Sequence, residues 1–162
     1  MHISPAICAA LALSVIPVQS GAQDHHASAD KRGAMVMGFD QQRTAHHFAL
    51  FPDGGSIEVR VKNPADVESR DAIRAHLPHI ARLFGDGNFE APMLVHDSPN
   101  VPGTSRMAAH KADIRYRYIE TNDGGRVDIV TRHPEALAAI HDFLRFQIAD
   151  HKTGDAVVVR KR

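Results

Sequence analysis

The sequence repeats one pattern of strands and turns at an interval of 70 residues, and this repeat limits the fold more than any other feature. Asp-Gly-Gly occurs at 53–55 and again at 123–125. On both sides of each tripeptide apolar and polar residues alternate, which is typical of strands that bury one face. Asp-Gly favours a tight hairpin turn, because both residues tolerate positive φ angles. Each copy then reaches a proline, Pro64 or Pro134, and proline is common in the first turn of a helix.

The repeat predicts an α+β fold: a four-stranded antiparallel sheet with two helices on one face, in a pseudo-duplicated ββα-ββα chain. The helices align only after a shift of three residues, which sets Ala72-Ile73 against Ala139-Ile140. Two unrelated hairpin–helix units would show the same signals, and this alternative stays open. The strands are expected near residues 44–51, 56–62, 113–120 and 126–131, and the helices near 65–84 and 134–151.

Two segments are expected to interrupt this regular pattern. Pro78 lies inside the first helical run and predicts a kink or a short break there. Residues 86–111 are rich in proline and follow no period. We expect them to form a long ordered loop, and loops of that length in compact domains are often functional.

The N-terminal region has the layout of a secretory signal peptide. Residues 5–18 are apolar but too short to span a bilayer, and small residues at Ser20 and Ala22 suit cleavage after Ala22. A buried helix is the alternative, since no Lys or Arg precedes the apolar run. We therefore expect a signal peptide at 1–22, a flexible N-terminal arm at 23–43 and a single α+β domain at 44–158. The mature protein would be periplasmic or secreted, with no membrane attachment after cleavage.

Composition excludes some partners and singles out histidine. Lys+Arg and Asp+Glu both number 19, so neither nucleic acid nor an anionic membrane surface is an expected partner. The only cysteine, Cys8, lies in the expected signal peptide, so the mature chain has no disulfide. Eleven of the twelve histidines lie after residue 22.

Four segments, AHHFALFPDGGSIEV, IRAHLPHIARLF, APMLVHDSPNVPG and ALAAIHDFLRFQIADHKTGD, resemble a family of small exported bacterial proteins of uncharacterised activity. The resemblance covers about residues 33–158. Some members of that family carry the name aspartate carbamoyltransferase. The sequence does not support this activity, because such enzymes are cytosolic, much longer and use a Ser-Thr-Arg-Thr phosphate motif. The closest string here is Thr104-Ser105-Arg106-Met107.

Standard catalytic and nucleotide-binding motifs are missing from the sequence. It contains no GxSxG, HExxH, GxGxxG or P-loop string, so no organic cofactor is indicated. The charged residues that alternate along the strands are expected to form a solvated outer sheet face. That face could also form a homodimer.

Histidine is therefore the best candidate for chemistry, because neutral imidazole is the commonest metal ligand. Strand alternation places His46 on the inner face of the sheet and His47 on the outer face. His76 and His141 are expected on the core-facing sides of the two helices. We predict that His46, His76 and His141 form a zinc or copper site, with His79 or His96 as a substitute ligand. Thioether ligands from Met35, Met37 or Met93 would suit Cu(I).

Cleavage after Ala22 would create a second candidate site at the new N-terminus. The mature chain would begin Gln23-Asp24-His25, a free amine followed by histidine at the third position. The amine, two amides and the His25 imidazole could surround Cu(II) or Ni(II) in a plane. A polar arm without a metal is the alternative.

Three classes of function remain open on the sequence alone. The first is a metal-binding or metal-handling protein, for copper or a similar ion. The second is a small periplasmic enzyme that uses His46 or His141 as acid–base, with the 86–111 segment over a pocket. The third is an interaction or dimerisation module that uses the open sheet face.

Overall fold

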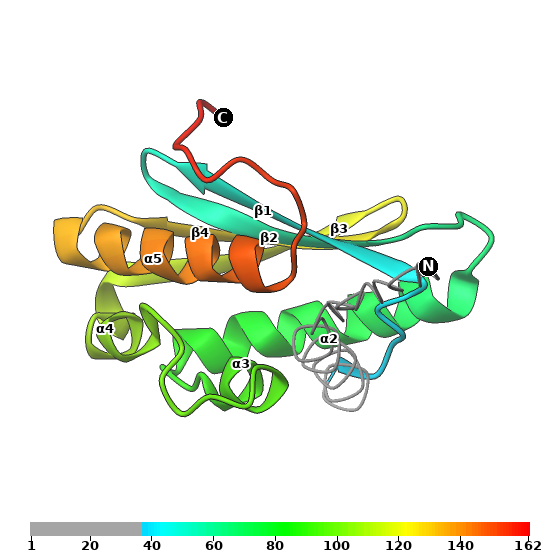
Figure 1. Cartoon of the computed structure of the whole chain (residues 1–162), viewed down its shortest axis with the longest axis horizontal. Helices are drawn as coiled ribbons and strands as arrows, with labels where there is room; N and C mark the ends of the chain where they lie inside the picture. Colours follow the sequence, from blue (N-terminus) through cyan, green and yellow to red (C-terminus); the bar gives the residue numbers. More distant parts are fainter. Residues whose placement is uncertain (1–36) are drawn as a thin grey trace, which may run out of the picture.

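The computed structural model describes residues 37–162. The expected signal peptide, His25 and Met35 lie outside the described residues. In chain order the elements are β1 (Thr44–Phe51), β2 (Gly54–Val61), α2 (Val67–Gly85), α3 (Glu90–Val95), α4 (Thr104–Ala109), the 3-10 turn η1 (Lys111–Asp113), β3 (Ile114–Thr121), β4 (Gly124–Thr131) and α5 (Pro134–Asp150) (Figure 1). No helix among residues 37–162 is both long and apolar enough to cross a membrane.

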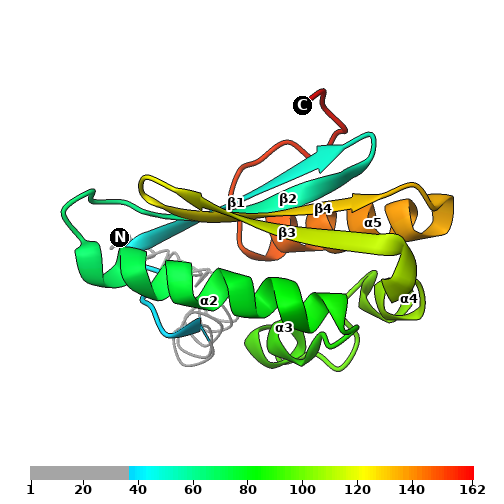
Figure 2. The same ribbon diagram turned by 180° about the vertical axis from the view of Figure 1, so that it is seen from behind.

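The predicted α+β architecture is confirmed. All strand pairs are antiparallel, in the order β1-β2-β4-β3, and both long helices cover the same face of the sheet (Figures 1 and 2). Helix α2 packs mainly on β3 and β4, whereas α5 packs on β1 and β2. Each helix therefore covers the hairpin of the other half, which joins the two units around one core.

The strand register shows the duplication directly. Thr44 pairs with Val61 in the first hairpin, and Ile114 pairs with Thr131 in the second, so the two hairpins match at an offset of 70 residues on both strands. At the centre of the sheet Ile57 pairs with its own equivalent, Val127. A pseudo-two-fold axis therefore passes through this central pair.

The repeated glycines are required by close backbone contact as well as by turn geometry. A Cβ atom on Gly54 would collide with the carbonyl oxygen of Ile129, and a Cβ atom on Gly124 would collide with that of Val59. These two contacts are equivalent under the repeat. Gly54 also has a φ of 145°, but Gly124 has no comparable positive φ. The shared constraint is therefore the approach of β2 and β4 at the centre of the sheet.

Residues 86–111 do not form the expected loop, and the expected break at Pro78 is absent. Residues 86–111 contain the short helices α3 and α4, whose six residues each are too few to show a helical period. Helix α2 runs through Pro78 without a break. It also begins later than expected, because the side chain of Asp66 caps it by accepting a hydrogen bond from the Ser69 amide at 3.1 Å.

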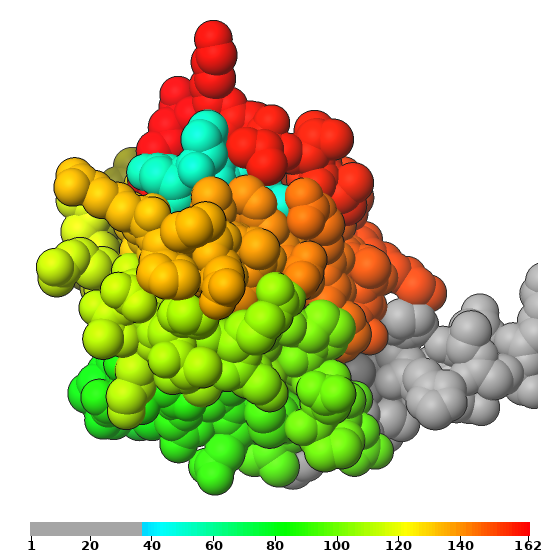
Figure 3. All heavy atoms as spheres, turned by 90° about the vertical axis from the view of Figure 1, so that its left-hand side faces the viewer, coloured from blue at the N-terminus to red at the C-terminus, as the bar shows by residue number. Residues whose placement is uncertain are grey.

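The C-terminal segment covers the free edge of β1. The Phe48 amide donates to the Asp155 carboxylate at 2.9 Å, and the Arg160 amide donates to the Leu50 carbonyl at 3.0 Å. Arg162 then lies over the Phe51 ring, 4.7 Å from its centroid. In Figure 3 this segment lies against the β1–β2 hairpin. Residues beyond 158 thus pack on the domain.

Candidate functional site

Four histidines line one cavity between the inner face of the sheet and the helices. The cavity contains about 580 Å³ of space between atoms, part of it open to solvent, and its walls are mostly apolar. His46 comes from β1, His76 from α2, His96 from the end of α3 and His151 from the end of α5. Four separate elements therefore direct imidazoles toward one space.

The ring of His46 lies in a stack of aromatic side chains. Its centroid is 6.1 Å from that of Phe39 and 5.4 Å from that of His151, with interplanar angles of 28° and 10°. Burial, followed by repulsion from His151 and His76, lowers the pKa of His46 to about 3. The ring is therefore neutral at physiological pH. Phe39 itself is buried, so this part of the N-terminal arm belongs to the cavity wall.

His76 approaches the cavity from α2 on the other side of Phe39. The two rings meet edge to face, with centroids 5.7 Å apart and an interplanar angle of 81°. Burial and then repulsion from His79 lower the pKa of His76 to about 4. His76 is therefore also neutral, and its lone pair is available to a ligand without competition from protons at neutral pH.

Among the histidines that lie beside a carboxylate, His96 is the most buried, with a side chain that is 2% exposed. Its Nδ1 lies 2.7 Å from the Asp150 carboxylate, and its Nε2 lies 3.1 Å from the Gln147 side-chain amide. The carboxylate favours a proton on Nδ1, which leaves the lone pair on Nε2. The Gln147 amide nitrogen is buried with no hydrogen-bond partner among the described residues. Turning that amide would direct its NH₂ group to Nε2 and satisfy both residues.

His151 completes the group and was not included in the predicted site. Its ring meets that of His96 at 5.0 Å and 74°, besides the stack on His46. A helical-period argument could have found it, because His151 follows the buried Leu144 and Ile148 at helical spacing. His151 cannot share an ion with His141, because ten residues of helix separate them by about 15 Å.

The structure brings together three of the six predicted ligands and separates the others. His141 is buried as expected, but its Nε2 donates to the carbonyls of Phe51 and Gly54 at 2.9 and 3.0 Å. It does not line the cavity. His79 is exposed and accepts from Arg82 at 2.9 Å, and His25 lies outside the described residues.

The two thioether candidates among the described residues, Met37 and Met93, lie in different places. Met37 lines the cavity, whereas Met93 lines a separate surface depression. His47 lies on the opposite side of the sheet from the cavity. There its Nδ1 is 3.3 Å from Asp155 and its Nε2 is 2.8 Å from Arg60. The side chains of the adjacent residues His46 and His47 therefore lie on opposite faces of the sheet, in different environments.

No protein-family model, curated protein or solved structure matches this chain.

Proposed function

We propose that this protein binds a transition-metal ion of the copper type in the cavity lined by His46, His76, His96 and His151. The observation that carries the proposal is the convergence of four imidazoles from four elements on one cavity. Burial keeps two of them neutral, with pKa values of about 3 and about 4. Metals bind imidazole in its neutral form, so these rings need not lose a proton above about pH 5 to act as ligands.

The surroundings favour a soft ion. Met37 adds a thioether to the cavity lining, and thioether with imidazole is a ligand set that suits Cu(I). Asp150 orients His96 as carboxylates orient metal-bound histidines. Among the described residues, no three of the cavity imidazoles have nitrogens within 4.8 Å of one another. To bind one ion, the parallel stack of His46 on His151 must open, and Gln147 must move away from the Nε2 of His96. Zinc is the alternative ion, with the imidazoles as ligands and without the thioether.

The test is a metal titration of the full mature chain. Cu(I) affinity would be measured by competition with a chromophoric chelator, and Zn²⁺ affinity in parallel. We expect one cavity ion per chain and a loss of at least tenfold in affinity in His76→Gln. His79→Gln is the matched control, because His79 is on the same helix but exposed and outside the cavity.

Equal affinities of wild type, His76→Gln and His46→Gln would contradict the proposal. X-ray absorption at the copper edge adds a second check. It should report nitrogen ligands, with a sulfur that disappears in Met37→Leu.

A small acid–base enzyme is the second candidate function. The His96–Asp150 pair favours it, because a histidine oriented by a carboxylate in an apolar cavity is the arrangement of a general base. This candidate predicts that the cavity binds a small organic molecule without metal. Ligand-induced shifts of the His96 ring signals in metal-free protein would support it over the metal site. Export to the periplasm and a homodimer through the sheet face stay predictions from the sequence.

A further inference from the structure

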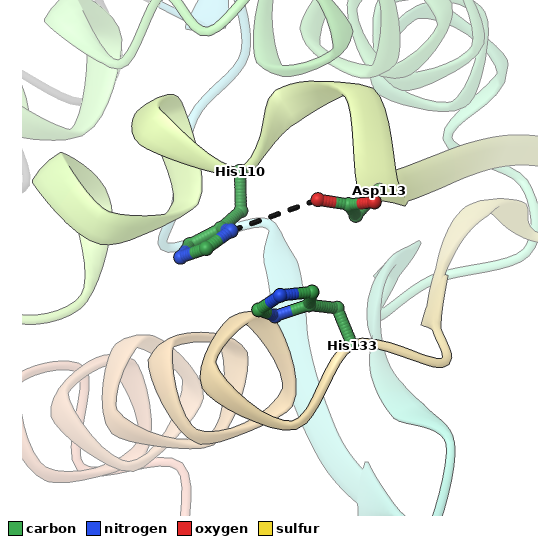
Figure 4. A group of neighbouring side chains, drawn as sticks. All are labelled: His110, Asp113 and His133. Atoms are coloured by element: carbon green, nitrogen blue, oxygen red, sulfur yellow. Dashed lines mark ion pairs between the residues drawn. The ribbon is translucent and has the colours of Figure 1, made fainter.

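A second group of metal-ligating side chains lies far from the histidine cavity. His110, Asp113 and His133 each offer one ligand atom, and these atoms all lie within 4.8 Å of one another (Figure 4). His133 immediately precedes α5, whereas His151 follows its end. With 17 residues between them in α5, the two groups are separated by about 25 Å along the helix axis. They cannot share an ion.

Hydrogen bonds to the backbone groups of these three residues hold them in place. The Thr131 hydroxyl donates to the Asp113 carbonyl at 2.9 Å and accepts from the His133 amide at 3.0 Å. The Asp113 amide donates to the His110 carbonyl at 2.9 Å. Thr131 therefore ties η1 to the start of α5, and the buried hydroxyl fixes the spacing of the ligands before any ion binds.

The side chains are arranged like a site with two imidazoles and one carboxylate. The His110 Nδ1 lies 3.6 Å from the Asp113 carboxylate, and the rings of His110 and His133 have centroids 4.3 Å apart. Ligands at about 2.0–2.2 Å from Zn²⁺ in a tetrahedron are separated by about 3.3–3.6 Å, so small side-chain rotations suffice. The Nδ1 of His133 is buried and has no hydrogen-bond partner in the described part of the chain.

A carboxylate outside the triad fits the role of an orienting partner. Glu135 lies 3.2 Å from the His110 Nε2. When Nε2–H donates to Glu135, the lone pair of His110 is on Nδ1, which faces Asp113. Without an ion, the competing arrangement is a protonated His110 held between Asp113 and Glu135 as a double ion pair. That arrangement leaves the buried nitrogen of His133 unused.

We propose that His110, Asp113 and His133 bind one divalent ion of the zinc class, with Glu135 as the hydrogen-bond acceptor that orients His110. Two imidazoles and a carboxylate leave at least one position open to water. The site is independent of the cavity proposed above for a copper-type ion. It is also harder in ligand character, since it has a carboxylate and no thioether.

The experiment uses the full mature chain in which His46→Gln and His76→Gln remove cavity ligands. Zn²⁺ binding is measured by chelator competition, and Co²⁺ binding by its visible absorption. We expect one Zn²⁺ per chain in this background, and at least tenfold weaker binding after Asp113→Asn or His133→Gln. Asp142→Asn is the matched control, because Asp142 is an exposed carboxylate on α5 away from the triad. Intense visible bands should show four-coordinate Co²⁺.

Three outcomes would overturn this proposal. They are no Zn²⁺ bound in the cavity-deficient background, binding that Asp113→Asn and His133→Gln leave unchanged, and Co²⁺ bands typical of the six-coordinate aqueous ion. Thermal unfolding without metal checks that each variant is folded. If His133→Gln does not fold, Asp113→Asn carries the test, because the Asp113 side chain is 50% exposed and its backbone contacts remain. If the wild-type protein does not bind Cu(I), the cavity proposal is refuted and the proposal for His110, Asp113 and His133 is unaffected.

Discussion

The rings of His46 and His151 lie nearly parallel, with centroids 5.4 Å apart and an interplanar angle of 10°. One ring belongs to the first half of the first strand, and the other follows the last helix. Two imidazolium ions could not occupy this stack without strong repulsion, so the contact excludes simultaneous protonation of the two rings. Both rings line the cavity, so protonation of either would change the charge inside it.

The first prediction concerns stability in acid. The pKa of His46 is lowered to about 3 and that of His76 to about 4 in the folded chain, against 6.5 for an ordinary histidine. Between about pH 6.5 and pH 4 the unfolded state binds more protons than the folded state. The free energy of unfolding should therefore fall as pH falls through this range, by at most about 1.4 kcal/mol per pH unit for each ring.

Urea unfolding of metal-free protein between pH 7 and pH 4 measures this slope. His46→Phe should reduce it, because the aromatic stack remains and the titrating group is removed. Ile129→Val is the control, because Ile129 is buried on β4 and does not line the cavity: it should lower stability equally at every pH and leave the slope unchanged. A slope in His46→Phe equal to that of the wild type would contradict the assigned pKa shift.

The second prediction separates His141 from metal binding. His141→Ala removes the donor that satisfies the carbonyls of Phe51 and Gly54. Leaving these acceptors unpaired should cost roughly 1–3 kcal/mol of unfolding free energy. Affinity for a cavity ion should not change, because His141 does not line the cavity. Unfolding curves together with a metal titration check both statements, and a variant of full stability that loses metal would refute them.

The third prediction concerns the repeated glycines. Gly54→Ala and Gly124→Ala should each destabilise the protein by roughly 2 kcal/mol or more, because the new methyl group meets a carbonyl oxygen of the neighbouring strand. Gly85→Ala is the matched control: its nearest contact is the Tyr116 ring at 3.9 Å. That variant should keep or slightly raise stability, since alanine favours the helix. Thermal unfolding of the three variants tests this prediction. Equal losses of stability at all three positions would argue against the close approach of the carbonyl oxygens to Gly54 and Gly124.

The fourth prediction concerns the cover on β1. Asp155→Ala removes the acceptor for the Phe48 amide and should cost about 1–2 kcal/mol. Burial alone would raise the pKa of Asp155, but hydrogen bonds from Phe48, Thr153 and His47 outweigh it and lower the pKa. The contribution of the carboxylate is therefore present above its unfolded pKa and lost only as pH falls below that range. Asp155→Asn is the control, because its amide oxygen can still accept.

The fifth prediction concerns the mature N-terminus. Cleavage after Ala22 should leave Gln23-Asp24-His25, and mass spectrometry of exported protein identifies this end. A free amine should give a Cu(II) visible band that His25→Ala abolishes. Pyroglutamate at Gln23, or a cut at another residue, would refute this N-terminal site.

Periodicity predicted the strands and long helices well, because one face of each is buried and the other is not. It could not predict the cavity ligands equally well. The helical stripe places His141 on the buried side correctly, but burial does not say how far along the helix axis its partner lies. His141 reaches the β1–β2 turn, while His151, ten residues later, reaches His46.

Local interactions explain the other differences. Helices α3 and α4 have six residues each and bury Val95 and Met107, and no period can reveal them at that length. The triad of His110, Asp113 and His133 joins η1 to the start of α5 through Thr131. Only His110 and Asp113 are near each other in sequence, so the third member needs the tertiary structure.

The pairing of Leu50 with Val159 also has a consequence for the order of assembly. A strand near the start of the domain receives its outer neighbour from a segment made more than 100 residues later. During synthesis, the polar edge of β1 stays open until residues 155–160 have emerged. Chains interrupted before that point would present a bare strand to one another, and aggregation of truncated products should exceed that of the complete domain.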